Sequence, residues 1–427
     1  MSAKSKILRD GYTITAILFC LILLYFFLSL CLTIPDIQKH IQKDINGTIL
    51  NEDLEAEDEP EVIAPTPSLM KLIFKSTENA INKVVPNRMF LIDVNGLVQR
   101  FFNKSLIPEP NENNNVFRMT NGQLTYTYPD IGVRIAHKNF SVLNRYLDSV
   151  GTNLIYIQAP YKINKYNNQL PYGLTDFPNQ NADKLIEGLY KLQIDTIDYR
   201  DVFATLKTNY NDLFFNTDHH WKTETAFFAY QYLLDYLKTS YGFSYNPKYY
   251  ELKNFESITL KQSFIGSLAN RVGRYYTGID DFTFIYPTFD THITYMKYDE
   301  QGLLSSIRTG SFYESVFYND RMSQPNTPLP YRDNCYFNGN PALGRIINHM
   351  VPEGKVLFVQ DSFGKPLASF MALNFHEVDT IDLRDYKEDY LIDFIKNDHY
   401  DYVFILYNPS ALKRSTYYRQ FRFYDYD

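Results

Sequence analysis

Cysteine is scarce in this chain of 427 residues, which contains only Cys20, Cys31 and Cys335. The first two lie in one apolar run near the N-terminus, so Cys335 has no partner for a disulfide bridge in the rest of the chain. No zinc-type spacing of cysteine and histidine is present either. A domain of this length does not need disulfides outside the cell. The scarcity of cysteine excludes a disulfide scaffold, but it does not decide whether the protein lies inside or outside the cell.

Long basic runs are also missing from the body of the chain. The net charge is −7 and the pI is about 5.7, which argues against a nucleic-acid partner. Tryptophan occurs once, whereas 37 tyrosines and 32 phenylalanines bring the aromatic content to 16%. Tyrosine on a surface suits amphipathic ligands such as sugars, but it is also an ordinary sheet residue.

An uncharged apolar run covers residues 12–34 and follows three basic residues. As a helix it is long enough to cross a bilayer of roughly 30 Å, and the basic residues before it favour a cytoplasmic N-terminus. No small-residue cleavage site follows, so an anchor is favoured over a cleaved signal peptide. We predict a cytoplasmic segment at 1–11, a transmembrane helix at 12–34, and a single-pass cell-membrane protein whose remaining domain is extracellular.

Residues 35–70 have the composition of a tether. An acidic run at 52–61 is followed by Pro65 and Pro67. Like charges repel and proline stiffens the backbone, so this segment is expected to be extended and solvated. The folded domain is then expected at 71–427.

Hydrophobic periodicity predicts an α/β fold for that domain. A helical pattern over 137–149 ends at Gly151, a buried strand covers 153–158, and a second helix covers 182–191. Helix, strand and helix in alternation are typical of a sheet with helices on its faces. The pattern returns in buried strands expected at residues 355–359, 378–383 and 402–407, with helices at 367–373 and 391–396.

Two regions depart from this pattern. Residues 89–93 have the composition of a short strand, and Asn95-Gly96 after them indicates a turn. Residues from about 246 to 340 are irregular and rich in Tyr, Phe, Thr and Asp, with short strand-like runs. We predict that they form an inserted β-rich lobe that lines or covers a site.

Residues 217–221 read Thr-Asp-His-His-Trp and hold two of the eight histidines and the only tryptophan. They precede a helix expected at about 223–238. In an extended segment residues i and i+2 point the same way, so the Asp218 carboxylate can reach a ring nitrogen of His220. His219 then points elsewhere. Trp221 is expected to pack the loop against the following helix, with a place in a cleft wall as the alternative.

Ser362 lies far downstream, at an expected strand-to-helix turn. A serine is a poor nucleophile until a neighbouring imidazole takes its proton, and an acid holds that imidazole in the useful tautomer. Ser362, His220 and Asp218 are therefore the predicted nucleophile, base and acid of an acyl transferase or hydrolase. The backbone N–H groups at the start of the following helix, including that of Phe363, are suited to an oxyanion.

Residues 217–221 resemble the signature of the DHHW family of bacterial surface proteins. That family is related to the SGNH-like O-acetyltransferases that modify alginate and other exopolysaccharides. Those proteins resemble circularly permuted SGNH hydrolases, because their Asp-x-His element precedes their Gly-Asp-Ser element, as it does here. The resemblance covers residues 86–410 and implies an SGNH-hydrolase-like three-layer sandwich with a permuted motif order. Shorter matching stretches lie at residues 94–97, 264–268, 338–340 and 381–384.

The resemblance implies acetyl transfer to an extracellular polysaccharide through an acetyl-Ser362 intermediate, without a cofactor or metal. It also implies a membrane-bound O-acyltransferase partner that supplies the acetyl groups. The glycine that usually precedes Asp-Ser is replaced by Gln360, whose larger side chain is expected to narrow the turn or contact substrate. Arg384 and Asn408 follow successive strands and are further candidates for oxyanion or substrate contacts, with salt bridging or turn capping as the alternative.

Three alternatives remain open from the residues. The same triad with water as acceptor gives a carbohydrate acetylesterase. The Gln360 replacement and the abundant tyrosine also suit a catalytically inactive glycan-binding or assembly protein on the cell surface. A metal site formed by Asp218, His219 and His220 is disfavoured, because adjacent histidines rarely both bind one ion.

Overall fold

The computed structural model describes residues 87–107 and 115–413, residue 77, and scattered positions between 20 and 39. Most of the predicted membrane span and nearly all of the predicted tether lie outside these residues. Among the described residues, no helix has both the length and the apolar character needed to cross a bilayer. The chain divides into two compact units, Met1–Val94 and Asn95–Asp427, and the fold described below is that of the second unit.

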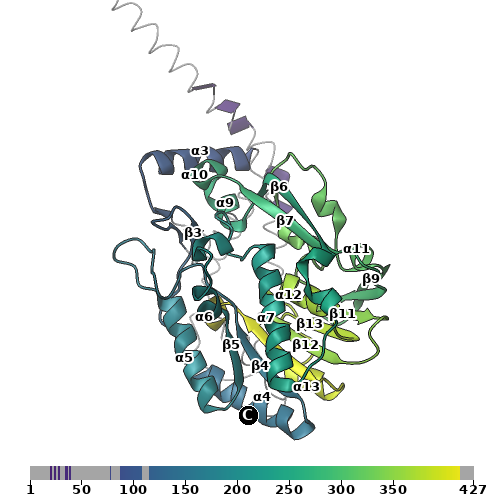
Figure 1. Ribbon diagram of the computed structural model, residues 1–427. Helices are drawn as coiled ribbons and strands as arrows, with labels where there is room; N and C mark the ends of the chain where they lie inside the picture. Colours follow the sequence, from purple (N-terminus) through teal and green to yellow (C-terminus); the bar gives the residue numbers. More distant parts are fainter. Residues whose placement is uncertain are drawn as a thin grey trace, which may run out of the picture. The chain divides into compact units, whose positions relative to one another are not determined.

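An eight-stranded mixed sheet forms the centre of this unit (Figure 1). Its strand order is β5-β4-β14-β12-β13-β11-β8-β9. The first five strands are parallel, and β11, β8 and β9 are antiparallel to their neighbours. In chain order the strands are β4 (Asn153–Gln158), β5 (Asp195–Asp198), β8 (Ile293–Tyr298), β9 (Leu304–Gly310), β11 (Leu343–Asn348), β12 (Lys355–Gln360), β13 (Glu377–Ile381) and β14 (Tyr402–Tyr407).

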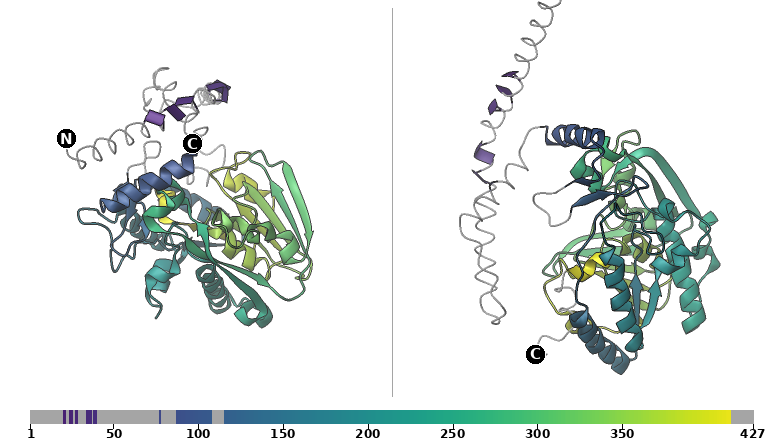
Figure 2. Two further views of the ribbon diagram at one scale, coloured as in Figure 1. Left: turned by 90° about the horizontal axis from the view of Figure 1, so that it is seen from above. Right: turned by 90° about the vertical axis from the view of Figure 1, so that its left-hand side faces the viewer.

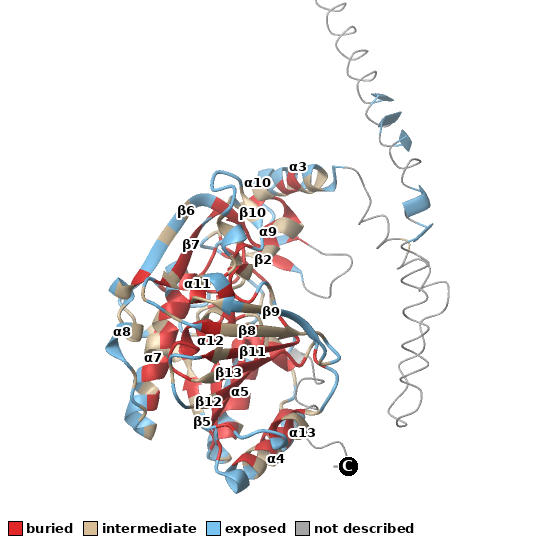
Figure 3. Cartoon of the chain, turned by 90° about the vertical axis from the view of Figure 1, so that its right-hand side faces the viewer, coloured by how far each residue is buried: buried red, intermediate tan, exposed pale blue. Residues whose placement is uncertain are grey.

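Helices cover both faces of the sheet, which gives the three-layer sandwich that was expected (Figure 2). Alternate residues of β12 show this directly, since Phe358 packs into one apolar cluster and Val359 into the other. With both faces covered, the central strands are continuously apolar and buried (Figure 3). One layer contains α4 (Arg134–Val150), α5 (Phe177–Lys191) and α13 (Leu391–Lys396), and the other contains α6 (Tyr199–Ala204), α7 (Thr223–Tyr241) and α12 (Gly364–Met371).

Two small sheets accompany the main one. They are β1 (Leu106–Ile107), β2 (Val116–Arg118) and β3 (Leu124–Thr125), and β10 (Leu329–Pro330), β6 (Phe255–Ile265) and β7 (Asp280–Pro287). The predicted lobe at 246–340 is therefore only partly separate. Its β6, β7 and β10 form their own sheet, whereas β8 and β9 extend the main sheet, because β8 pairs with β11 along its whole length.

Short helices connect these elements. The α-helical ones are α8 (Pro247–Tyr250), α9 (Ser267–Val272), α10 (Arg274–Thr277) and α11 (Phe312–Ser315), and the 3₁₀ turns are η1 (Tyr210–Leu213), η2 (Leu252–Asn254), η3 (Asn319–Met322), η4 (Arg332–Cys335) and η5 (Pro409–Lys413).

The strand and turn predicted over residues 89–97 are wrong, because this segment belongs to the helix α3 (Arg88–Phe101). Gly96 is not needed for a left-handed turn here, and its φ is not positive. A Cβ at this position would lie 2.3 Å from the Val272 carbonyl oxygen and 3.3 Å from the Gly273 Cα. The glycine therefore serves the close approach of the helix to the end of α9, and the helix overrides the Asn-Gly turn preference.

Candidate active site

The predicted site residues come together at one edge of the main sheet. Ser362 lies in the loop between β12 and α12, and Asp218 and His220 lie in the loop that enters α7. Because β4, β14 and β12 are parallel, their carboxyl ends lie at the same edge. The fold thus brings together two motifs that are more than 140 positions apart in the chain.

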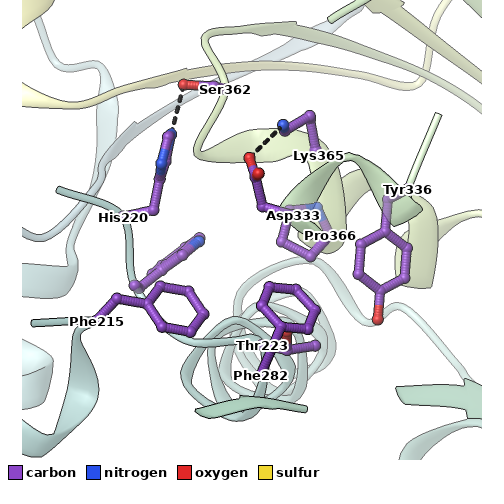
Figure 4. Close-up of a pocket in the computed structure, with 10 residues that line it drawn as sticks. Phe215, His220, Thr223, Phe282, Asp333, Tyr336, Ser362, Lys365 and Pro366 are labelled. Atoms are coloured by element: carbon purple, nitrogen blue, oxygen red, sulfur yellow. Dashed lines mark hydrogen bonds and ion pairs between the residues drawn. The ribbon is translucent and has the colours of Figure 1, made fainter. Parts of the chain in front are cut away.

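Ser362, His220 and Asp218 form a continuous hydrogen-bonded chain, and Figure 4 shows its link between Ser362 and His220. The Ser362 Oγ lies 2.7 Å from the His220 Nε2, and the His220 Nδ1 lies 2.5 Å from the Asp218 Oδ1. A carboxylate beside Nδ1 favours the tautomer with its proton there, which leaves Nε2 to accept the hydroxyl proton. The arrangement can therefore activate a serine for nucleophilic attack.

The Asp218 carboxylate is held in one orientation. Its Oδ1 also accepts the His220 backbone N–H at 2.9 Å, and its Oδ2 accepts the Ser267 backbone N–H at 2.5 Å. Burial alone raises the pKa of this carboxyl, but the two histidines and these hydrogen bonds hold the pKa well below its usual value. Asp218 is therefore an ionised partner for an imidazolium at His220.

Among its described contacts, His219 has none with Ser362, but the prediction that it points away from His220 is wrong, because its ring lies 3.9 Å from that of His220 and its Nδ1 lies 3.4 Å from the Asp218 Oδ1. Its Nδ1 is 3.2 Å from the Ser267 Oγ, and its ring lies 5.3 Å from that of Tyr126. Burial, followed by the nearby His220, lowers the pKa of His219 well below its usual value. This imidazole is therefore neutral and adds no second charge beside His220.

The loop around residue 218 is fixed by residues that sequence reasoning missed. Asp280 on β7 accepts the Asn216 N–H at 3.0 Å and the Thr217 N–H at 2.7 Å through its two carboxylate oxygens. Gly266 approaches so closely that a Cβ there would lie 2.4 Å from the Asp218 Cβ. Asp280 and Gly266 are far from the motif in the chain, so no local pattern gives their contacts with it, although Gly266 lies in the matching stretch 264–268.

Lys162 is a buried lysine at the same loop. It follows β4, and its Nζ donates to the carbonyl oxygens of Leu124 at 2.7 Å, of Asn216 at 3.4 Å, and of Asp218. Burial lowers the pKa of Lys162 to about 7, against the opposing pull of Asp280 and Asp218. These contacts give Lys162 a role in holding the backbone of the loop.

Lys162→Met is expected to lower kcat for p-nitrophenyl acetate by about 100-fold, because three carbonyl oxygens lose their donor and the loop shifts. The measurement is steady-state release of p-nitrophenol, with circular dichroism to verify folding. Lys165→Met is the matched control, because Lys165 lies three residues on and pairs with Asp201 at 2.5 Å. A folded Lys162→Met variant with wild-type kcat would contradict this role.

The other predicted oxyanion and substrate contacts are engaged within the protein. The Phe363 N–H donates to the Asp361 Oδ1 at 2.9 Å, and the Asp361 Oδ2 accepts the Asn408 N–H at 2.9 Å and side-chain amide at 2.6 Å. The Arg384 guanidinium pairs with Asp382, with Nε 2.8 Å from Oδ1. The contact of Asn408 with Asp361 joins the loops after β14 and β12, and Arg384 forms a salt bridge two residues away, so both show the contacts of the salt-bridge and turn-capping alternative.

Gln360 does not line either cavity beside Ser362. Its side chain is buried and lies against Gly364, where a Cβ would be 2.0 Å from the Gln360 Oε1. In the usual motif a glycine precedes Asp-Ser and needs no room for a side chain. Here the Gln360 side chain takes the space beside Gly364, which is free because Gly364 has no Cβ. The predicted substrate contact by Gln360 has no support in this geometry.

Trp221 both packs the loop and forms a wall beside the serine. Its ring lies 6.0 Å from that of Tyr199 and 5.8 Å from that of Phe363. Its buried Nε1 has no hydrogen-bond partner. It lines a cavity of about 20 Å³. The other lining residues are Phe215, His220, Thr223, Phe282, Asp333, Tyr336, Ser362, Lys365 and Pro366 (Figure 4).

A larger cleft of about 250 Å³ also reaches Ser362 and His220. Most of its lining residues are of polar types. The lining consists of Asp218, His220, Phe264, Ser267, Tyr331, Asp333, Asn334, Gly339, Asn340, Ser362 and Lys365. The nucleophile therefore faces both a small, largely aromatic cavity and a wide polar cleft.

Comparison with known proteins agrees with this geometry. Residues 130–276 match the family model described as the SGNH hydrolase-like domain of the acetyltransferase AlgX. The predicted resemblance to SGNH-like acetyltransferases is confirmed. The matched range contains Asp218 and His220, and Ser362 lies beyond it. The comparison with curated proteins gives no match.

Solved structures of two proteins show the same fold. Bacillus cereus PatB1 is 18% identical, with a TM-score of 0.57 over 71% of this chain and 99% of its own. A DHHW family protein from Eubacterium siraeum is also 18% identical, with a TM-score of 0.54 over 74% of this chain and 97% of its own. A second PatB1 structure, 17% identical with a TM-score of 0.56 over 72% of this chain and 98% of its own, is described as carrying a sulfonyl adduct.

Among the described residues, the side chains of Asp218, His219 and His220 offer atoms within 4.8 Å of one another that could bind a metal. Both ring nitrogens of His220 are already engaged, by Asp218 and Ser362. The donor set therefore suits proton transfer better than metal binding. A second acidic group, Glu377, Asp379 and Asp398, is bridged by Arg345 and Lys355.

Proposed function

We propose that this protein is an O-acetyltransferase that modifies an extracellular polysaccharide through Ser362, His220 and Asp218. The observation that carries the proposal is the hydrogen-bonded chain from the Ser362 Oγ to the Asp218 carboxylate, with links of 2.7 and 2.5 Å. The matched family model is that of an acetyltransferase, which supports acetyl as the transferred group.

The proposed reaction has two halves. In the first, the His220 Nε2 takes the hydroxyl proton as the Ser362 Oγ attacks the acetyl carbonyl, and the protonated imidazole then gives that proton to the leaving group of the donor. In the second, a sugar hydroxyl loses its proton to His220 and attacks the acetyl-serine. The Ser362 oxygen leaves and recovers the proton, and Asp218 stabilises the imidazolium in both halves.

The small cavity beside Ser362 supports a short acyl group. Its volume of about 20 Å³ is enough for about one water molecule, and aromatic side chains form much of its wall. An acetyl methyl fits such a space better than a longer chain. The Trp221 Nε1 is buried and has no hydrogen-bond partner among the described residues, and we propose it as a donor to the acyl oxygen once the acyl group occupies the cavity.

Trp221→Phe is expected to lower kcat for p-nitrophenyl acetate by about tenfold. The substitution keeps an aromatic ring at this position but removes the indole N–H, so one hydrogen bond to the acyl oxygen is lost. Stopped-flow release of p-nitrophenol measures this step. Tyr199→Phe is the matched control, because it removes a polar group beside Trp221 whose hydrogen bond goes to Ala229, at 2.6 Å, rather than to the site. Equal kcat in wild type and Trp221→Phe would exclude the indole as a donor.

The deciding experiment combines labelling and transfer. Phenylmethylsulfonyl fluoride is expected to modify Ser362, as mass spectrometry of peptides would show, and the PatB1 sulfonyl adduct makes this reagent a natural choice. With p-nitrophenyl acetate as donor and an oligosaccharide as acceptor, acetylated sugar is the expected product. Acetate without acetylated sugar would instead support the acetylesterase alternative, and no turnover would support the inactive surface protein.

We also propose a membrane setting for this activity. The apolar run at residues 12–34 and the acidic, proline-containing segment at 35–70 support an anchor and a spacer that hold the domain outside the cell. A membrane-bound O-acyltransferase is the proposed source of acetyl groups. Cleavage of the domain by protease added to intact cells is the expected result, and full protection would argue against an extracellular location.

A further inference from the structure

The polar cleft beside Ser362 has one wall built from residues 331–340, which the reaction above does not use. Tyr331, Asp333, Asn334, Gly339 and Asn340 contribute to the lining of the cleft. The nucleophile and the base line the same cleft. Any acceptor hydroxyl that approaches His220 through this cleft therefore passes along this wall.

A buried arginine holds the start of this wall rigidly. The Arg332 guanidinium donates to five backbone carbonyl oxygens, those of Ser263, Arg321, Ser323, Gln324 and Thr327. The preceding strand β10 pairs with β6. These hydrogen bonds of Arg332 fix the backbone of the preceding residue, Tyr331, so the Tyr331 side chain need not make a contact to be held in place.

Tyr331 is the residue that this scaffold presents. Its φ is 62°, in the left-handed region that a tyrosine rarely adopts, and its side chain is 53% exposed. Backbone strain of this kind persists where the surrounding structure enforces it, and it is concentrated at ligand sites. A rigid exposed aromatic ring at the rim of a cleft loses little conformational entropy when it binds a ligand.

The groups around Tyr331 suit a sugar ring. A sugar presents apolar C–H faces and hydroxyl edges, which match an aromatic face with polar groups beside it. The Asn334 Oδ1 accepts from Lys365 at 2.8 Å, which leaves its amide N–H groups for a hydroxyl oxygen. Asn340 and Asp333 line the same cleft.

The charge of the cleft favours an uncharged sugar. Among the described residues that line it, Lys365 is the only lysine or arginine. Its ammonium is 2.9 Å from the Asp333 carboxylate and 2.8 Å from the Asn334 oxygen. A carboxylate on the acceptor would therefore meet Asp218 and Asp333 without an unpaired cation to offset them.

We propose that Tyr331, with Asn334 beside it, forms the acceptor subsite, and that this subsite takes a neutral sugar ring rather than a uronic acid. The proposal rests on the proposed function, because it assigns the acceptor of the acetyl group on Ser362. Tyr331 acts by stacking and positioning, and it takes no part in proton transfer.

The test measures how the acetyl-enzyme divides between sugar and water. The full chain is given p-nitrophenyl acetate together with cellopentaose, a pentamer of N-acetylglucosamine, or a pentamer of mannuronate. We expect a neutral pentamer to be acetylated in preference to mannuronate. Tyr331→Ala is expected to lower the ratio of transfer to hydrolysis about tenfold, which is about 1.4 kcal/mol, through a higher KM for the sugar, and Tyr331→Phe is expected to restore it.

Tyr190→Ala is the matched control, because Tyr190 is 59% exposed and lies at the end of α5, before the amino end of β5 and so away from the site. This variant is expected to keep the wild-type ratio. Preference for mannuronate, or an unchanged ratio in Tyr331→Ala, would overturn the proposed subsite. Failure of the wild type to release p-nitrophenol would instead contradict the role of Ser362, so the two failures are distinguishable.

Discussion

Ser362→Ala is expected to lower kcat for p-nitrophenyl acetate by about 10⁴- to 10⁶-fold, since no other group replaces the nucleophile and only binding contributions remain. The Ser362 Oγ lies 2.7 Å from the His220 Nε2, so its removal also leaves the base without its proton donor. Release of p-nitrophenol under saturating ester measures the effect, and sulfonylation at this position should disappear in the same variant.

Ser369→Ala is the control for this result. Ser369 lies on the same α12 helix, is buried, and bonds only to the Lys365 carbonyl oxygen, at 2.8 Å, among its described contacts. It therefore tests the loss of a hydroxyl from the helix without touching the site. Ser362→Ala with more than a tenth of wild-type turnover would show that another residue attacks the ester, and the proposed mechanism would be wrong.

Asp218→Asn is expected to lower kcat by about 10⁴-fold, because an amide no longer holds the proton on the His220 Nδ1 or stabilises the imidazolium. Steady-state turnover measures the loss. Asp212→Asn is the control, since Asp212 is an exposed acid six residues earlier in the chain. An Asp218→Asn variant within tenfold of the wild type would remove Asp218 from the catalytic chain.

The Asp218→Asn substitution is also expected to change how the unfolding free energy depends on pH. The pKa of Asp218 lies well below its usual value in the folded protein, so its ionised form stabilises the fold above the unfolded value of about 3.9. This contribution is lost as the pH falls through the native pKa. Asp218→Asn should therefore show a smaller decrease in unfolding free energy between pH 5 and pH 3, as urea titration at each pH would show.

Several elements could be predicted because their patterns are local. The strands at 153–158 and 402–407 match β4 and β14 at both ends, since a central strand covered on both faces is a continuous apolar run. The helix at 391–396 also matches α13. The helix at 89–97 could not be predicted in this way, because the reason for Gly96 is a contact with residues 272 and 273.

The contacts of the residues that hold the loop at 216–218 could not be predicted from the sequence for the same reason. Lys162 and Asp280 bond to the backbone of residues 216–218, and the Gly266 N–H donates to the Thr217 Oγ1, each from more than 45 positions away. Single polar residues at such separations carry no periodic signal. The assignment of β8 and β9 to the main sheet likewise depends on pairing between β8 and β11, which no alternation within either strand specifies.

The sequence by itself determined which groups are proposed to react: an acid, an imidazole and a serine in an order that resembles SGNH-like acetyltransferases. Asp218 and His220 could be paired from their spacing, because side chains two residues apart in an extended segment point the same way. The tertiary structure alone decided whether Ser362 reaches them, because parallel strands from opposite ends of the chain must align their carboxyl ends to bring the Ser362 Oγ within 2.7 Å of His220.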